Sequence, residues 1–384
     1  MGKKFTIEDK IISLKVDDAY AVWFKASKKF LLLEKPAFFV LDLILKDFQV
    51  NDIIKKFSSL YKYPLVEVES FITEIAVKFN QFLESQTEQN NTLESKMVPD
   101  ISESIFFSKR AYKIGEKQLN LFYGDKELEF VIHPLISHFE LYKSEIKAKK
   151  YFIYRQSGNI IFQIDNEITE QFEHHETGFL KAAFLLRMLS FVHHVDYEDW
   201  MITLHASAVS FEKNAILFSA AAGKGKSTLS ALLHANGFHL LSDDFLAMNV
   251  MNRKIYQVPV ATTIKKGSYE VLLPHYPELE NLLLEKAYTG KEVRYLPINT
   301  NLNVGNGYPV RKLVFVEYSK KKEFSFLKMD KKSAIKILLE ETWIKPNLQC
   351  VTEFFNWFDE TQFFSLIYSE TTQAVKITKE LFSK

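Results

Sequence analysis

Hydrophobic residues in the first part of the chain follow two successive patterns. Apolar residues first form short runs or alternate with polar ones, which predicts strands at residues 12–16, 21–24 and 30–33. They then recur at helical spacing, which predicts helices at residues 35–46, 51–61 and 64–82. Strands followed by three helices within so short a segment predict a small winged-helix-like domain over residues 1–85.

A polar segment separates this domain from the rest of the chain. Residues 86–96 contain one apolar residue, Leu93, and predict a linker. Short apolar runs beyond it predict strands at residues 112–114, 119–123, 129–132, 151–154 and 160–164. Gly158-Asn159 suits a hairpin turn between the last two of these strands. The run at residues 179–195 predicts a buried helix, because charged residues and histidines interrupt it too often for a membrane span.

The clearest local pattern is a strand, a glycine-containing loop and a helix. The apolar run at residues 215–218 predicts a buried strand. Leu229, Leu232 and Leu233 then recur at helical spacing, and Gly237 stands where a helix would end. The connecting segment has the composition of a phosphate-binding loop and consists of Ala220, Ala221, Ala222, Gly223, Lys224, Gly225, Lys226, Ser227 and Thr228.

The residue types in this loop suit phosphate chemistry. Glycines let the backbone turn so that successive N–H groups point at phosphate oxygens, and the start of the helix adds further donors. Lys226 can reach the β- and γ-phosphates, and the Ser227 hydroxyl can bind Mg²⁺. The full motif has glycine at the position of Ala220, and alanine is disfavoured at a positive φ, so an altered loop is expected. A plain Gly/Lys turn is the alternative.

Two carboxylates follow the next apolar run. Residues 239–242 predict a strand, and Asp243 and Asp244 come directly after it. Ligands of α/β sheets bind at the carboxyl ends of strands, where carboxylates can hold Mg²⁺ or accept a proton from a hydroxyl. An aspartate turn before a hairpin is the alternative. His205 ends another apolar run, where a lone histidine is more often structural than functional.

From His205 to Asp244 the chain resembles the catalytic core of the HPr serine kinase family, whose P-loop fold is shared with the ATP-dependent phosphoenolpyruvate carboxykinases. The family pattern is a histidine at a strand end, the loop G-x-S-G-x-G-K-[ST], a helix and an Asp-Asp pair, and the chain aligns without a gap. Ala222 replaces the loop serine, and Thr228 stands where the kinases usually carry glutamate. The resemblance implies an α/β fold, α+β over the whole chain, with residues 97–384 as one continuous P-loop domain.

The resemblance also implies a role for each matched residue. Asp244 would take the proton from an acceptor hydroxyl, and His205 would orient it. ATP and Mg²⁺ would be held by residues 221–228, with Ser227 and Asp243 as metal ligands. The family's second metal ligand, a glutamate, has no clear counterpart here. Downstream cations are candidates for binding phosphate or the acceptor, namely Lys265, Lys266, Lys291 and Arg294.

Residues 1–85 resemble the PqqD-like peptide-recognition domains of peptide-modifying systems. The order of strands and helices matches, as does the segment FLLLE at residues 30–34 before the first helix. The resemblance implies that a leader peptide binds as an added β-strand. A generic winged helix or an oligomerisation module is the alternative. DNA binding is disfavoured because the third helix is acidic, with Glu67, Glu69, Glu74 and Glu84.

Composition adds few further constraints. The 384 residues carry a net charge of +1, so no general attraction to nucleic acid is expected. The single cysteine, Cys350, excludes an internal disulfide and a multi-cysteine metal site. The pairs His174-His175 and His193-His194 lack the i, i+4 spacing of metal ligands on one helix face. Neither a secretory signal nor a membrane span is expected, which predicts a cytoplasmic location.

Together these observations predict an ATP- and Mg²⁺-dependent kinase that phosphorylates a serine or threonine hydroxyl of a peptide. The acceptor would be the precursor of a ribosomally made, modified peptide, recruited by the amino-terminal domain. Two alternatives stay open: a nucleotide-dependent binding module without transfer activity, and a kinase of HPr or of a small molecule. The expected partners are the peptide and the nucleotide, and self-association, as in HPr kinases, is an open alternative.

Overall fold

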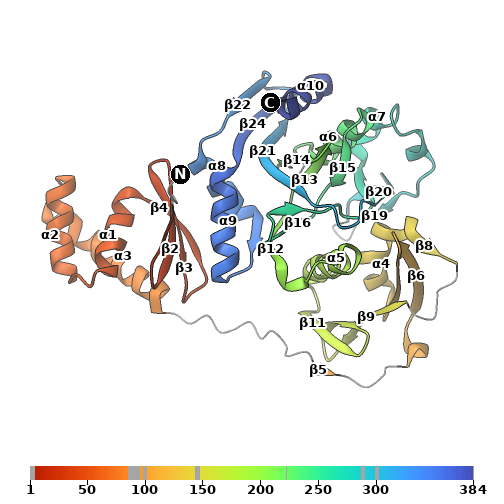
Figure 1. The fold of residues 1–384 in the computed structure, drawn as a ribbon, viewed down its shortest axis with the longest axis horizontal. Coiled ribbons are helices and arrows are strands. Elements are labelled where there is room, and N and C mark those ends of the chain that lie inside the picture. Colours follow the sequence, from red (N-terminus) through yellow and green to blue (C-terminus); the bar gives the residue numbers. More distant parts are fainter. Residues whose placement is uncertain are drawn as a thin grey trace. The chain divides into compact units, whose positions relative to one another are not determined.

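The computed structural model describes residues 5–84, 96–97, 102–142, 148–221, 223–286, 290–298 and 302–383. The fold is mixed α/β with several sheets, as predicted (Figure 1). It divides into two compact units. We call Met1–Asn90 with Lys328–Phe363 the amino-terminal unit, and Asn91–Leu327 with Phe364–Lys384 the P-loop unit. The predicted linker, residues 86–96, lies outside the described residues except for Lys96.

The amino-terminal unit begins with a four-stranded antiparallel sheet in the order β1-β2-β3-β4. Its strands are β1 (Phe5–Ile7), β2 (Ile11–Val16), β3 (Ala19–Phe24) and β4 (Phe30–Glu34). Three helices follow, α1 (Lys35–Leu45), α2 (Val50–Tyr61) and α3 (Leu65–Glu84). The strands and helices predicted for this part of the chain are therefore confirmed. Their apolar positions pack into one core, which includes Ile53, Phe57, Val68, Ile72 and Phe79.

A segment from far along the sequence completes this unit. It contains α8 (Lys331–Glu341), β23 (Thr342–Ile344) and α9 (Leu348–Glu360). Figure 1 shows α1–α3 on one side of the four-stranded sheet and α8 and α9 on the other. The Phe30 ring meets the rings of Phe354 and Phe355 edge-on, with centroids 6.4 and 6.2 Å apart. Because α9 packs its aromatic face here, Lys328–Phe363 belongs to this unit and not to the continuous domain expected over residues 97–384.

The P-loop unit opens with a seven-stranded sheet in the order β5-β11-β10-β9-β7-β6-β8. Its strands are β5 (Lys96–Met97), β6 (Ser108–Ile114), β7 (Lys117–Tyr123), β8 (Glu140–Leu141), β9 (Lys149–Gln156), β10 (Asn159–Ile164) and β11 (Glu167–Glu173). The predicted hairpin at Gly158 is confirmed, since β9 and β10 pair antiparallel on either side of it. Two helices accompany this sheet, α4 (Lys126–Ile136) and α5 (Thr177–His193), the second of which is the predicted buried helix.

The strand predicted at residues 129–132 is wrong, because this stretch lies within α4. The Asp125 carboxylate accepts a hydrogen bond from the Leu128 N–H at 2.9 Å and caps the helix. The buried apolar residues of α4 recur at helical spacing, at Leu128, Val131, Ile132 and Leu135. A short apolar run suits both a strand and a buried helix, and here the cap and the continued spacing select the helix.

A larger sheet forms the second half of the P-loop unit, with strands in the order β15-β13-β14-β21-β17-β16-β12. At its centre, β14 (Asn214–Ser219) pairs in parallel with β21 (Tyr308–Tyr318) and antiparallel with β13 (Ser207–Phe211). Also in this sheet are β12 (Trp200–Leu204), β15 (His239–Ser242), β16 (Leu246–Asn249) and β17 (Lys254–Ile255). β24 (Gln362–Tyr368) pairs with β21 and with β22 (Ser325–Lys328).

Helix α6 (Lys226–Ala235) lies at the centre of the core of this half. It contacts α10 (Thr371–Ser383) and β18 (Thr262–Lys265). β18 belongs to a three-stranded sheet with β20 (Glu292–Leu296) and β19 (Glu285–Lys286), and α7 (Tyr269–Leu272) follows β18 in the chain. The apolar face of α6 is buried between these elements, so the start of the helix is held in place from several sides.

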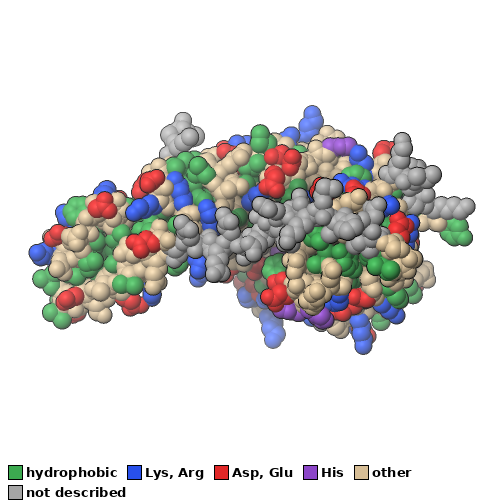
Figure 2. All heavy atoms as spheres, turned by 90° about the horizontal axis from the view of Figure 1, so that it is seen from below, with side chains coloured by type: hydrophobic (Ala, Val, Ile, Leu, Met, Phe, Trp, Pro, Cys, Tyr) green, Lys and Arg blue, Asp and Glu red, His purple; other side chains and the backbone are tan. Residues whose placement is uncertain are grey.

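The surface carries charges of both signs. Figure 2 shows acidic and basic side chains interspersed over the face that it presents. The charged groups on that face therefore do not form one broad patch of a single sign. Within the part of the chain that the structure describes, no helix combines the length and the apolar character needed to cross a bilayer.

Candidate functional site

The predicted phosphate-binding loop connects β14 to α6, which is the context that such a loop requires. Gly223 and Gly225 adopt left-handed backbone conformations, with φ of +83° and +93°. Ala220 and Ala221 do not, so the positive φ that alanine would disfavour falls on the two glycines instead. Ala222 lies outside the described residues. The alanines therefore impose no backbone strain where the loop is described.

Two tyrosines, Tyr318 and Tyr368, pack against the loop, and the sequence analysis did not identify them. A Cβ added to Gly225 would lie 2.8 Å from the Tyr318 Cβ and 3.2 Å from the Tyr368 hydroxyl. The Tyr318 N–H donates to the Lys224 carbonyl at 2.9 Å, so the end of β21 is tied to the loop. Only glycine fits at position 225, because the position combines a positive φ with a close approach to another strand.

Two of the predicted loop residues have side chains engaged by other parts of the protein. The Lys224 ammonium pairs with Glu317 at 2.9 Å, and the Lys224 N–H donates to the Ala221 carbonyl at 3.1 Å. The Thr228 hydroxyl lies 2.6 Å from the Ser268 hydroxyl, which follows β18. These contacts anchor the loop and the first turn of α6, so the side chains of Lys224 and Thr228 are already engaged within the protein.

Of the four residues predicted to be catalytic, which are His205, Lys226, Asp243 and Asp244, three meet at one point, namely Lys226, Asp244 and His205. The Lys226 Nζ lies 3.4 Å from Asp244 Oδ1 and donates to the His205 carbonyl, also at 3.4 Å. The His205 Nδ1 lies 3.3 Å from the same Asp244 Oδ1. The Lys226 side chain is only 8% exposed, whereas the Asp244 side chain is 46% exposed and open to a reactant.

A fourth side chain, that of Lys181, also contacts Asp244, and no motif in the sequence identified it. The Lys181 Nζ, in the first half of α5, lies 3.7 Å from Asp244 Oδ2. Lys181 was treated only as a charge that interrupts an apolar run. A lysine that belongs to no motif and lies on a separate helix gives no local sequence signal for a site contact.

Asp243 is placed differently from Asp244, although the two are neighbours in sequence. Asp243 is buried, and the Ser227 hydroxyl donates a hydrogen bond to its carboxylate. Its Oδ1 atom is also buried and has no hydrogen-bond partner in the protein. A buried carboxylate oxygen without a partner beside a serine hydroxyl is a donor set that suits a hard cation such as Mg²⁺.

The environments of the two aspartates shift their pKa values in opposite directions. Burial, reinforced by the charge of Asp244, raises the pKa of Asp243 to about 7. Burial also acts to raise the pKa of Asp244, but the positive charges of Lys181 and Lys226, together with His205, outweigh it and lower that pKa. At neutral pH, Asp244 is therefore ionised, while Asp243 is divided between its two protonation states.

Among the described residues, no group of three or more His, Cys, Asp or Glu side chains is arranged to hold a metal.

The downstream cations lie in the sheet formed by β18, β20 and β19. Lys265 ends β18, and Lys266 is exposed and lies 3.9 Å from Glu292. Arg294 donates to the Leu282 carbonyl at 3.0 Å, and its guanidinium lies 4.5 Å from the centre of the Tyr269 ring. Lys291 precedes β20 and is exposed. Arg294 and Lys266 therefore both have partners within their own region.

Comparisons with known proteins found solved structures that are similar to this chain. No family model matches the chain, and no curated protein matches it. The HPr(Ser) kinase/phosphatase from Coxiella burnetii is a similar solved structure, with 12% sequence identity and a TM-score of 0.24. The match covers 46% of this chain and 94% of that chain. Likeness at this level assigns neither a family nor a function to the chain, and the PqqD-like resemblance of residues 1–85 stays a prediction.

Proposed function

We propose that the P-loop unit transfers the γ-phosphoryl group of ATP to a serine or threonine hydroxyl of a peptide. The observation that carries the proposal is the convergence of Lys226, at the start of α6, with Asp244 and His205. A buried cation at the end of a glycine loop suits phosphate, and a half-exposed, ionised carboxylate beside it suits the acceptor hydroxyl.

The loop supplies the nucleotide site in this proposal. The backbone N–H groups of the loop and the start of α6 bind phosphate oxygens, and Lys226 contacts the β- and γ-phosphates. Ser227 and Asp243 would hold Mg²⁺, which would offset negative charge on the phosphates. The opposite pKa shifts of the two aspartates support this division of roles, since Asp243 lies buried against the Ser227 hydroxyl and Asp244 is half-exposed.

Asp244 is the base in this proposal. The acceptor oxygen forms a bond to the γ-phosphorus as the bond from that phosphorus to the β–γ bridging oxygen breaks, and the hydroxyl proton passes to Asp244. In the unliganded protein, Lys226 and His205 both lie against Asp244 Oδ1. Engagement of Lys226 by phosphate weakens one of these contacts and frees that oxygen to accept the proton.

The amino-terminal unit recruits the peptide in this proposal, which would be the precursor of a ribosomally made, modified peptide. Its support is the position of β4 at an edge of the four-stranded sheet, where a leader can add as a further strand. Tethering the acceptor through a leader raises its effective concentration at the P-loop site without new contacts there.

The test is phosphorylation followed by intact mass. The protein is incubated with Mg²⁺, ATP and the short peptides encoded beside its gene, and a product heavier by about 80 Da is expected, the mass of an added HPO₃ group. Asp244→Asn keeps the size of the side chain and removes the base, so the product should be lost. A product that the variant makes at the wild-type rate would show that Asp244 is not the base.

A second function is a nucleotide-dependent binding module without transfer. One observation favours it: in the unliganded protein, the two oxygens of Asp244 lie against Lys181, Lys226 and His205. Nucleotide binding without a mass gain on any peptide would favour this module. A kinase of HPr or of a small molecule differs again, since it would phosphorylate an acceptor that carries no leader.

A further inference from the structure

We propose that Lys181 is a positioning residue for phosphoryl transfer, one that orients the carboxylate of Asp244. This inference rests on the proposed function and adds to it a residue outside every motif of the site. Lys181 lies in α5, whereas Asp244 follows β15, so the contact joins the two halves of the P-loop unit. Both residues belong to the same compact unit.

The contacts of Asp244 differ between its two oxygens. Lys226 and His205 contact Oδ1 at 3.4 and 3.3 Å, and Lys181 contacts Oδ2 at 3.7 Å. Each oxygen of the Asp244 carboxylate therefore has its own partners. The Lys181 side chain is only 20% exposed, so its ammonium is less screened by water than that of a surface lysine.

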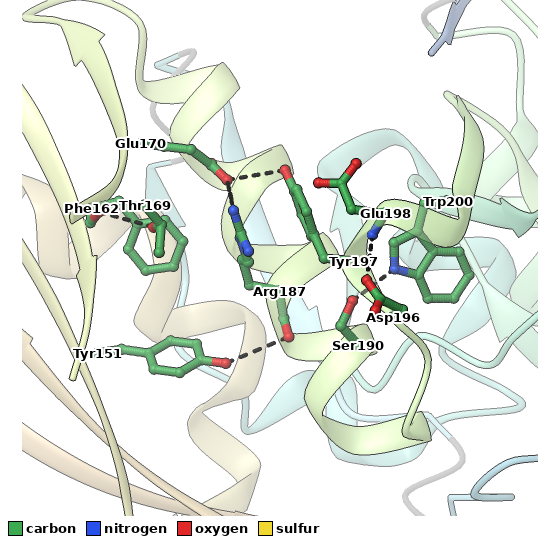
Figure 3. Close-up of polar contacts among 10 residues, drawn as sticks. All are labelled: Tyr151, Phe162, Thr169, Glu170, Arg187, Ser190, Asp196, Tyr197, Glu198 and Trp200. Atoms are coloured by element: carbon green, nitrogen blue, oxygen red, sulfur yellow. Dashed lines mark hydrogen bonds and ion pairs between the residues drawn. The ribbon is translucent and has the colours of Figure 1, made fainter. Parts of the chain in front are cut away.

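The helix that carries Lys181 is itself held firmly (Figure 3). Arg187, further along α5, donates to Glu170 of β11 at 3.0 and 3.1 Å, and the Tyr197 hydroxyl donates to the same carboxylate at 3.0 Å. The Arg187 guanidinium also lies 3.4 Å from the centre of the Tyr197 ring. This cluster fixes α5 to the strand before it and to the turn after it.

A second bond in Figure 3 fixes α5 to the sheet of the site. The Trp200 indole N–H, at the start of β12, donates to the Ser190 hydroxyl at 2.8 Å. β12 runs directly to His205, so the helix of Lys181 and the strand of His205 share a rigid connection. Two partners of Asp244 are therefore placed relative to each other before any ligand arrives.

The contact between Lys181 and Asp244 Oδ2 becomes important when the nucleotide binds. Lys226 has to contact phosphate oxygens, which weakens its hold on Oδ1 when the acceptor hydroxyl needs that oxygen. Lys181 still holds Oδ2, so the carboxylate keeps its orientation with Oδ1 toward the hydroxyl. Small errors in the placement of reacting groups reduce rates by about 100-fold, and we infer that Lys181 prevents such an error.

The variant that tests this is Lys181→Met, which keeps the length of the side chain and removes its charge. We expect kcat for peptide phosphorylation to fall by about 10- to 100-fold, with the KM for ATP within about twofold of the wild-type value. Lys181→Arg restores a cation and should recover kcat to within about threefold of wild type. A rise in the KM for ATP with unchanged kcat would mean that Lys181 binds phosphate, and would overturn the positioning role.

A double variant asks whether Lys181 acts through Asp244. Lys181→Met combined with Asp244→Asn should be no slower than Asp244→Asn alone, because the carboxylate that Lys181 orients is already gone. A further loss on top of Asp244→Asn would overturn the inference. Lys109→Met is the matched control, since it removes a lysine from an exposed ion pair with Glu103 at 2.9 Å and should leave both constants unchanged.

The outcomes for the inference and for the proposed function differ. If the wild-type protein transfers no phosphoryl group to any peptide while it still binds ATP, the proposed function fails, and the role of Lys181 fails with it. If the wild-type protein transfers phosphate and Lys181→Met does so at the same rate, only the positioning role fails. If Lys181→Met lowers kcat and Lys181→Arg restores it, the result supports both the proposed function and the positioning role of Lys181.

Discussion

The two units of the molecule handle charge in opposite ways. In the P-loop unit, Lys226 and Asp243 are buried with 7% and 4% of their surface exposed. Among the described residues of the amino-terminal unit, the buried polar side chains are the uncharged Ser13, Ser27 and Thr361. Burying a charge is costly unless partners compensate for it, so a folded protein rarely retains such groups for stability alone. Among the described residues, the buried charged side chains therefore lie in the P-loop unit, the unit to which the proposed chemistry is assigned.

The largest effect is expected when the proposed base, Asp244, is removed. Asp244→Asn should lower kcat for peptide phosphorylation by about 1,000-fold, within the range that a general base contributes. The free energy of unfolding should fall as well, because the variant removes the charged partner of Lys226, whose side chain is only 8% exposed. Steady-state kinetics and urea denaturation measure the two quantities. Near-normal transfer in the variant would move the chemistry away from this carboxylate.

The next effect concerns stability and lies in the amino-terminal unit. Phe354→Ala removes a fully buried ring from the aromatic contacts of α9 and should lower the free energy of unfolding of that unit by about 3–5 kcal/mol. The kcat of the folded protein should be unchanged. Leu348→Ala on the same helix is the control, since that side chain is 49% exposed and its loss should cost little. Equal destabilisation by both variants would refute the packing of α9 described above.

A pH experiment sharpens the contrast within the P-loop unit. The pKa of Asp243 is about 7 in the folded protein and close to 3.8 when unfolded, so between these values the folded protein binds the extra proton. Stability should therefore fall as pH rises from about 4 to about 7, by on the order of 2–4 kcal/mol. Asp243→Asn should lack this loss. Denaturant titrations of both proteins without nucleotide test it, and parallel pH curves would contradict the raised pKa.

The smallest predicted effect separates two glycines with almost the same backbone conformation. Gly225 and Gly237 have φ of +93° and +92°, but only at Gly225 would a Cβ meet another strand. Alanine should cost about 1 kcal/mol of stability at Gly237 and more at Gly225, where the added Cβ also clashes with Tyr318. Gly225→Ala should in addition weaken ATP binding by about tenfold, because the loop must move away from Tyr318. Calorimetric titration measures this, and equal affinities in the two variants would show that the loop tolerates the shift.

The sequence predicted most where residue type and local spacing decide the structure. The strand, loop and helix around Lys226 lie close together in sequence, so Asp244 could be placed beside the loop from the end of its strand, whereas His205 was placed there only through the family resemblance. Lys181 could not, because its contact with Asp244 depends on how α5 packs against a different sheet. The helix at residues 129–132 was missed because a short apolar run suits either element.

Long-range packing explains why the sequence did not predict the unit to which residues 328–363 belong. Helices α8 and α9 each bury one face, and the apolar pattern of a helix does not say which part of the chain covers that face. In the structure, the sheet that begins with residue 5 covers it, through contacts such as that between Phe30 and Phe354. The assignment of residues 328–363 to the catalytic domain followed chain order, and chain order does not determine this contact.

The return of Lys328–Phe363 to the first unit has a consequence for limited proteolysis. The chain passes between the units at residues 90–91, 327–328 and 363–364. A single cut within residues 86–96 leaves an amino-terminal fragment still packed on Lys328–Phe363, which stays covalently joined to the larger fragment. The nicked protein should therefore migrate as two bands on a denaturing gel and elute as one species in native chromatography.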